Sequence, residues 1–327
     1  MNTATASATR SQRHTYRLSH AHRPGDAGRD ASGMPVGDGA PAQHDARVRM
    51  RRAVTVTLAI SFGAVLAITV PSMLGIGGTE WLSIATPVAQ WFPAVAVLVA
   101  ARVAGLRLPV SKLLSLGPVR ASRGAGTWGW AMALVGAALV AFLAMHFGIA
   151  TLTGTVEWTA GVDVLPIAVM VVPMLAFAAV AALGEEVAWR GFLWQAWRER
   201  FGLFGTILAT TGVWVLWHLP LLAAYGIAGD MSWRAVLASL ASLAFASALL
   251  GIARERGGNV WPAVLGHALM NSMLVFATSN LVTPADSLTD SAFWAFQSLG
   301  WAVWAIVLSA LSVTVPPRPR AMASPAA

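Results

Sequence analysis

The sequence predicts an all-α, polytopic membrane protein with about eight transmembrane helices. Three observations support this class: 57% of the 327 residues are hydrophobic, only 11% are charged, and the mean hydropathy is +0.65. A soluble domain of this size needs many more charged residues to cover its surface. Water-soluble classes are therefore excluded, and the lipid bilayer is the expected partner.

The chain contains no cysteine, which excludes disulfide frameworks, thiolate zinc sites, cysteine proteases and lipid-modified cysteines. The net charge of +8 and the pI of about 11.4 would by themselves suggest a nucleic-acid partner. However, nearly all basic residues lie beside apolar segments, not on a folded basic surface with interleaved aromatic residues. We therefore expect no nucleic-acid partner.

Residues 1–52 differ in composition from the rest and are predicted to form a disordered, basic cytoplasmic tail. They include nine arginines and one aromatic residue, Tyr16, and cannot bury enough apolar area to fold. The first apolar run begins at Ala53, too far along the chain for a signal peptide. Arg51 and Arg52 are interpreted as positive-inside residues beside the first span, not as a twin-arginine export signal.

Apolar runs long enough to cross a bilayer of roughly 30 Å recur from residue 53 onwards. The eight predicted spans are 53–73, 82–104, 127–149, 164–186, 204–225, 233–253, 260–279 and 293–315. With the tail inside, 21 of the 22 basic residues lie on the cytoplasmic side, and only Arg234 lies on the other. Both termini are therefore predicted to be cytoplasmic.

Two of these spans have features of their own. The fourth helical segment, from Pro166 to about Arg198, must exceed one span if it is to hold Glu185 within the membrane, so it is expected to be tilted, kinked or broken near Pro173. The sixth span carries small residues at four-residue spacing, which predicts a close helix-packing face; these are Ala238, Ser242 and Ala246.

Ionisable side chains inside spans are costly and usually face a cavity or a partner, so they carry the functional signal. The acidic residues predicted at membrane depth are Glu185 and Glu186, and the histidines are His146, His218 and His267. His146 has no ionisable neighbour at helical spacing. It is interpreted as a packed or interfacial histidine.

Glu186 and Arg190 are four residues apart and share one face of a helix, whereas Glu185 points about 100° away. Glu186 is therefore expected to pair with Arg190, which compensates a costly charge. The Glu185 side chain is expected to face a partner other than Arg190. A carboxylate in such a poorly hydrated site is suited to act as a general base. These three residues alone leave open the alternative of a structural cluster at a cytoplasmic helix end.

Two further spans place polar side chains at a similar depth. His218 follows Trp214 by four residues, and His267 and Asn271 form an i, i+4 pair. Each of these groups is costly when it faces lipid without a partner. Together with Glu185 they supply what amide hydrolysis needs: a base that activates water, a second group that orients it, and donors for the oxyanion.

The order of these motifs on successive helices resembles the CPBP intramembrane protease family. The motifs are Glu185-Glu186-x-x-x-Arg190, an aromatic-x-x-x-His218 and His267-x-x-x-Asn271. The family includes the CAAX prenyl endopeptidases and the bacteriocin-processing or self-immunity (Abi) proteins of bacteria. The resemblance covers roughly residues 165–280. Trp214 stands where the family usually has Phe, and an aromatic packing role survives this exchange.

The resemblance implies a division of roles among these residues. Glu185 and His218 would activate the attacking water. His267 and Asn271 would stabilise the oxyanion of the tetrahedral intermediate.

The resemblance also implies that Glu186 and Arg190 hold this arrangement in place. A metal is an open alternative, because Glu185, His218 and His267 could serve as three zinc ligands with an open fourth position. The chain has no His-Glu-x-x-His motif, and the three residues lie on separate helices. A glutamate-based mechanism without a cofactor is therefore favoured over a divalent metal such as zinc.

The expected organisation has four parts: the tail 1–52, three accessory transmembrane helices in 53–160, a CPBP/CAAX protease-like core in 161–280, and a final span with a short cytoplasmic tail in 281–327. The expected function is an intramembrane endopeptidase that cuts a membrane-associated protein or peptide. A single lysine against 21 arginines indicates a high-GC bacterium and hence its inner membrane. The alternatives are a non-catalytic bacteriocin-immunity or transport protein, and a structural membrane protein.

Overall fold

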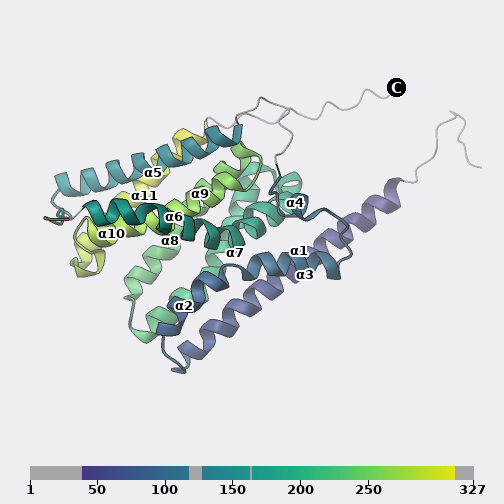
Figure 1. Ribbon diagram of the computed structural model, residues 1–327, viewed down its shortest axis with the longest axis horizontal. Helices are drawn as coiled ribbons and strands as arrows, with labels where there is room; N and C mark the ends of the chain where they lie inside the picture. Colours follow the sequence, from purple (N-terminus) through teal and green to yellow (C-terminus); the bar gives the residue numbers. More distant parts are fainter. Residues whose placement is uncertain (1–38, 118–126, 163, 314–327) are drawn as a thin grey trace, which may run out of the picture. The chain divides into compact units, whose positions relative to one another are not determined.

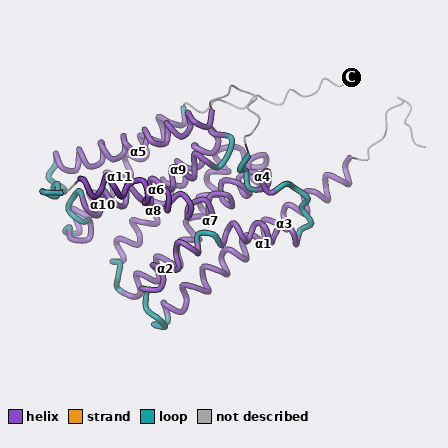
Figure 2. Tube along the Cα trace, viewed as in Figure 1, coloured by secondary structure: helices purple, strands orange, loops and turns teal. Residues whose placement is uncertain are grey.

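The computed structural model describes residues 39–117, 127–162 and 164–313. Within these ranges the chain consists of helices and connecting loops, with an isolated antiparallel bridge between Trp158 and Val282 (Figure 2). The predicted all-α class is confirmed. The chain divides into two compact units, Met1–Ala46 and Arg47–Ala327. The described part of the first unit is the beginning of helix α1, and the site described below lies in the second.

Figure 1 shows the helices of the described residues. In chain order the elements are α1 (Gly39–Met73), α2 (Glu80–Ala89), α3 (Phe92–Val103), α4 (Val110–Leu113), α5 (Thr127–Leu152), α6 (Val164–Glu186), the π-helix η1 (Val187–Leu193), α7 (Trp194–Ala228), α8 (Trp233–Gly257), α9 (Trp261–Leu269), the π-helix η2 (Met270–Leu274), α10 (Val275–Asn280), the 3-10 helix η3 (Ala285–Ser287) and α11 (Asp290–Ser312). In this part of the chain, five helical stretches are long and apolar enough to cross a membrane, and the bent pair α2 and α3 would be a sixth. The chain is a multi-pass membrane protein.

One of these stretches, Val169–Ala228, covers two predicted spans, 164–186 and 204–225. Its helical geometry is interrupted at Gly202, whose φ of 68° and ψ of −172° suit only glycine. The predicted span 260–279 corresponds to α9, η2 and α10 and is not among the five stretches. The total of eight spans and the cytoplasmic location of both termini stay predictions.

The start of α1 corrects the predicted boundary of the tail. Because α1 begins at Gly39, residues 39–52 are helical, although their composition predicted disorder. This stretch contains three Ala, four Arg and one Met, which favour helix. It is also continuous with an apolar span from which a helix can propagate. The rest of the predicted tail, residues 1–38, lies outside the described residues.

The fourth segment continues well past one span, as the sequence predicted, because α6 leads directly into η1 and α7. However, α6 is continuous across Pro173. The departure from α-helical geometry lies further on, in η1, which begins directly after Glu186 and contains Arg190. Short π-helices of this kind are frequent at functional sites.

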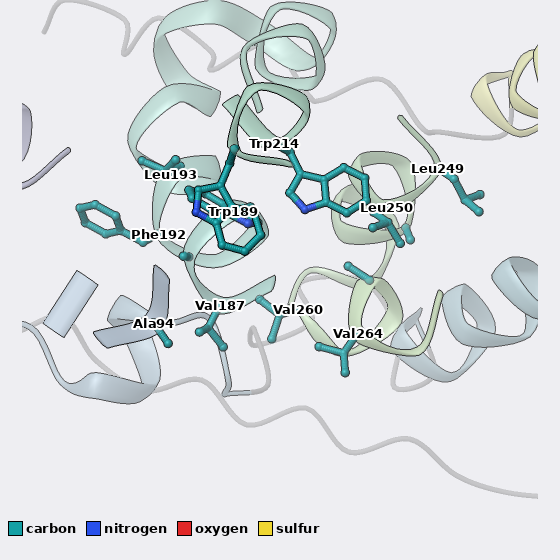
Figure 3. Packing of buried hydrophobic residues seen from close by; sticks show 14 of the residues in the cluster. Ala94, Val187, Trp189, Phe192, Leu193, Trp214, Leu249, Leu250, Val260 and Val264 are labelled. Atoms are coloured by element: carbon teal, nitrogen blue, oxygen red, sulfur yellow. The ribbon is translucent and has the colours of Figure 1, made fainter. Parts of the chain in front are cut away.

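The main hydrophobic core surrounds η1, all seven residues of which are buried. Figure 3 shows Trp189 and Phe192 of η1 together with Leu250 of α8 and Val264 of α9 in this cluster. Gly191 lets α4 approach closely, because a Cβ at this position would lie 2.6 Å from the carbonyl oxygen of Leu114. The core therefore holds the segment that follows Glu185 and Glu186 from several sides.

The end of α8 anchors η1 by hydrogen bonds. The Nε of Arg254 donates to the carbonyl oxygen of Arg190 at 2.7 Å, and its Nη2 donates to Ser115 Oγ at 3.1 Å. Beyond η1, Arg198 and Glu255 form an ion pair at 2.6 Å. These contacts satisfy a backbone carbonyl in the π-helix and fix it against α8.

Candidate active site

The structure brings four predicted site residues to one cavity of about 200 Å³. Glu185 lies at the end of α6, His218 in α7, His267 near the end of α9, and Asn271 in η2. Both acidic residues and the His267–Asn271 pair lie at junctions between an α-helix and a π-helix. Residues from three separate parts of the sequence therefore converge, as amide hydrolysis requires.

Glu185 is fully buried, and each of its carboxylate oxygens accepts one hydrogen bond. Gln90 Nε2 donates to Oε1 at 2.8 Å, and Trp214 Nε1 donates to Oε2 at 2.6 Å. Sequence reasoning missed both donors. It treated Trp214 as a packing residue only, and it overlooked Gln90, a side-chain amide inside an otherwise apolar run close to Pro87 and Pro93.

Glu186 faces a different set of partners from Glu185, as the helical spacing predicted. Arg190 Nη1 donates to Glu186 Oε1 at 3.0 Å, and both side chains are fully buried. Arg190 Nη2 also donates to Ser247 Oγ at 2.8 Å, and its guanidinium carbon lies 4.7 Å from the centre of the Trp214 ring. Arg190 therefore joins η1 to both α7 and α8.

His267 also contacts the carboxylate of Glu186. Its Nδ1 lies 2.9 Å from Glu186 Oε1. A carboxylate oxygen accepts, so Nδ1 carries the proton, and Nε2 is the nitrogen that remains for a ligand. Nε2 can donate to an oxyanion only when His267 is an imidazolium. The carboxylate of Glu186 is well placed to stabilise that charge.

His218 is oriented by its own helix. Its Nδ1 lies 2.8 Å from the carbonyl oxygen of Trp214, which can only accept. Nδ1 therefore carries a proton, and neutral His218 presents the lone pair of Nε2. The imidazole packs edge-on against Trp214 and Trp217, with ring centres 4.8 Å and 5.1 Å apart. This arrangement suits a group that accepts a hydrogen bond from water.

A second cavity, of about 500 Å³, borders the same residues. Trp214, His218, Leu243, His267 and Asn271 line both cavities, whereas Glu185 lines only the smaller one. The larger cavity extends between α5, α8 and α11. Its wall includes the small residues of the sixth predicted span, Ala238, Ser242 and Ala246, which therefore make room for this cavity.

His146 is a packed histidine, as the sequence predicted. It is buried between α5 and α11, where its Nε2 lies 3.0 Å from the carbonyl oxygen of Phe296. The two rings stack with centres 4.2 Å apart. His146 also forms part of the wall of the larger cavity.

The three zinc ligands considered from the sequence all line the smaller cavity. Within the described ranges, no group of three or more His, Cys, Asp or Glu residues is arranged to hold a metal ion. Both oxygens of Glu185 accept N–H groups, and Nδ1 of His218 and of His267 are each engaged in a hydrogen bond. These bonds leave Nε2 of both histidines free, so a mechanism without a metal stays a prediction.

The comparison with known proteins agrees with this geometry. Residues 166–273 match the family model described as type II CAAX prenyl endopeptidase Rce1-like. This segment contains the six predicted site residues: Glu185, Glu186, Arg190, His218, His267 and Asn271. This match supports the resemblance to the CPBP family over this segment. We refer to residues 166–273 as the CPBP core.

Among curated proteins, the chain is similar to CAAX prenyl protease 2 of Methanococcus maripaludis. The two are 27% identical over 105 residues, which cover 31% of this chain and 39% of the relative. The chain thus spans well under half of the relative's length. Gln90 lies outside the CPBP core, although it contacts Glu185 inside it.

Proposed function

We propose that the protein is an intramembrane endopeptidase that hydrolyses a peptide bond in a membrane-associated protein or peptide. The observation that carries this proposal is the convergence of Glu185, His218, His267 and Asn271 on one buried cavity inside the CPBP core. A carboxylate and an imidazole beside two potential oxyanion donors are the parts needed for water-mediated amide hydrolysis.

In the first step, Glu185 and His218 orient a water molecule by accepting its hydrogen bonds. The water oxygen attacks the carbonyl carbon of the scissile bond, its proton passes to Glu185, and the carbonyl oxygen becomes an oxyanion. In the second step the C–N bond breaks, and Glu185 returns the proton to the leaving nitrogen. The products are a carboxylic acid and an amine, so atoms and charge balance.

The oxyanion is stabilised by Asn271 Nδ2 and by Nε2 of a protonated His267. Glu186 supports that protonated form through its hydrogen bond to Nδ1, and Arg190 balances the charge of Glu186. Donors fixed in a water-poor site stabilise an oxyanion much more than they would in water. We propose that no metal takes part.

Two observations bear on the proposed substrate: the membrane setting of the chain and the name of the relative. The relative is called a CAAX prenyl protease. The strong preference for arginine over lysine in this chain favours a bacterial source, and we place the protein in the bacterial inner membrane. There a membrane-bound peptide or protein is the proposed substrate.

The experiment is a cleavage assay with the full chain purified and reconstituted into lipid vesicles. The probes are an internally quenched prenylated Cys-a-a-X peptide and a library of quenched apolar peptides without a prenyl group. Wild type is expected to cleave at least one probe, and Glu185→Gln and His218→Ala are expected to lose turnover by orders of magnitude while remaining folded. Equal turnover in wild type and Glu185→Gln would contradict the proposal and favour a binding or transport protein.

A further inference from the structure

The corner between α2 and α3 reaches into the site from outside the CPBP core. The two helices are bent by 44° at Gln90 and Trp91, between Pro87 in α2 and Pro93 in the first turn of α3 (Figure 1). Proline removes backbone donors and limits the helix on either side of the break. The bend leaves the side chain of Gln90 buried in the protein, although its neighbour Trp91 is 38% exposed.

A backbone contact fixes this corner against α6. A Cβ added to Gly184 would lie 2.5 Å from the carbonyl oxygen of Gln90 and 2.7 Å from the Cα of Trp91. These neighbours are backbone atoms, which cannot rotate away as a flexible side chain can. Glycine at position 184 therefore permits the contact, and the contact lies one residue before Glu185.

The corner and α7 together fix the plane of the Glu185 carboxylate. Gln90 holds Oε1 and Trp214 holds Oε2, each through one N–H donor. A carboxylate oxygen has a further lone pair, so both oxygens can still accept a hydrogen bond from water. A side-chain amide and an indole neither gain nor lose a charge near neutral pH. Their effect on Glu185 is therefore orientation.

The smaller cavity extends from Glu185 towards the accessory helices. Val65 and Ile68 of α1 and Thr86 and Ala89 of α2 line it, together with Gln90. Its volume of about 200 Å³ is enough for several water molecules, and its polar groups can hold them. Gln90 and Glu185 are absent from the lining of the larger cavity.

We propose that Gln90 is a positioning residue for Glu185, and that the cavity it borders holds the attacking water while the larger cavity receives the peptide. The accessory helices α1 and α2 and the α2–α3 corner thereby complete the active site of the CPBP core. This inference rests on the proposed protease function. It adds a role for a part of the chain that the family match does not cover.

The first test compares Gln90→Met with Val88→Met, a matched change at a 64% exposed residue near the end of α2, two positions before Gln90. Methionine keeps much of the volume of glutamine and lacks the N–H donor. With the quenched peptide that wild type cleaves, Gln90→Met is expected to lower kcat about 10- to 100-fold with KM within about twofold, because a misplaced reactive group loses about this much. Val88→Met is expected to match wild type.

Trp214→Phe gives a second variant if Gln90→Met folds poorly. It removes the other donor, keeps an aromatic ring, and is expected to lower kcat with little change in KM. The inference is wrong if Gln90→Met keeps its kcat within about twofold of wild type. The proposed function still stands in that case, provided that wild type and Val88→Met are active and Glu185→Gln is inactive. If wild type cleaves no probe, the proposed function itself fails, and the role of Gln90 fails with it.

The water-filled cavity can be tested without a substrate, because the chain has no cysteine of its own. Thr86→Cys places a unique thiol in the cavity wall, and Val88→Cys places one on the exposed face of α2. Methyl methanethiosulfonate reacts with the thiolate, which forms where water reaches the sulfur. In vesicles, Thr86→Cys is expected to react about tenfold faster or more; equal or slower reaction would show a dry cavity and overturn the proposal.

Discussion

The fully buried Glu186–Arg190 pair offers a sharp test of the charge arrangement around the site. Arg190→Met would leave Glu186 uncompensated except for the hydrogen bond to His267. Removing one partner of a buried pair typically costs about 3–5 kcal/mol. The remaining His267 contact places the expected loss near the lower end, about 3 kcal/mol. For a chain of 327 residues this lowers Tm by about 4–5 °C.

The assay is thermal unfolding in one detergent at one scan rate, followed by tryptophan fluorescence. Arg200→Met, at an exposed position, is the matched control and should stay within about 2 °C of wild type. The double variant Glu186→Gln with Arg190→Met should be more stable than Arg190→Met alone, because it removes the unpaired charge. A Tm loss below about 2 °C for Arg190→Met would refute the reasoning. So would a double variant whose Tm loss equals the sum of the losses of the two single variants.

The remaining predictions concern turnover. Asn271→Ala is expected to lower kcat by about 10²–10³-fold with little change in KM, because it removes an oxyanion donor; a pure rise in KM in steady-state assays would contradict this role. Ala246→Phe, which fills the larger cavity, should raise KM or abolish binding, whereas Leu237→Phe on the exposed face of α8 should not; equal kinetics for both would argue against peptide binding in that cavity. A chelator such as 1,10-phenanthroline should leave turnover unchanged in dialysed enzyme, and loss of activity restored by zinc would instead support the metal alternative.

The sequence was informative about the fold because the membrane imposes simple rules. Long apolar runs and the placement of arginines predicted a helical, multi-pass chain, and ionisable residues inside spans pointed to Glu185, His218 and His267. Helical spacing also predicted that Glu186 would pair with Arg190 while Glu185 would not.

The sequence could not predict the features that depend on packing between distant segments. Composition alone treated residues 39–52 as disordered, because it does not register that a helix propagates from an adjacent apolar span. The hydrogen bond from Gln90 to Glu185 joins residues 95 positions apart and requires the α2–α3 bend and Gly184 together. Likewise, the indole N–H of Trp214 became a functional candidate only once its direction was known.

The central claim is that the chain cuts peptide bonds by means of Glu185. The most direct measurement compares new peptide termini in the membrane and secreted proteomes of cells that carry wild type or Glu185→Gln at equal abundance. We predict a small set of termini that is present with wild type and lost in the variant, and that purified wild type reproduces on the same substrate. Identical termini in the two cell lines, with the biological activity of the variant preserved, would contradict the account.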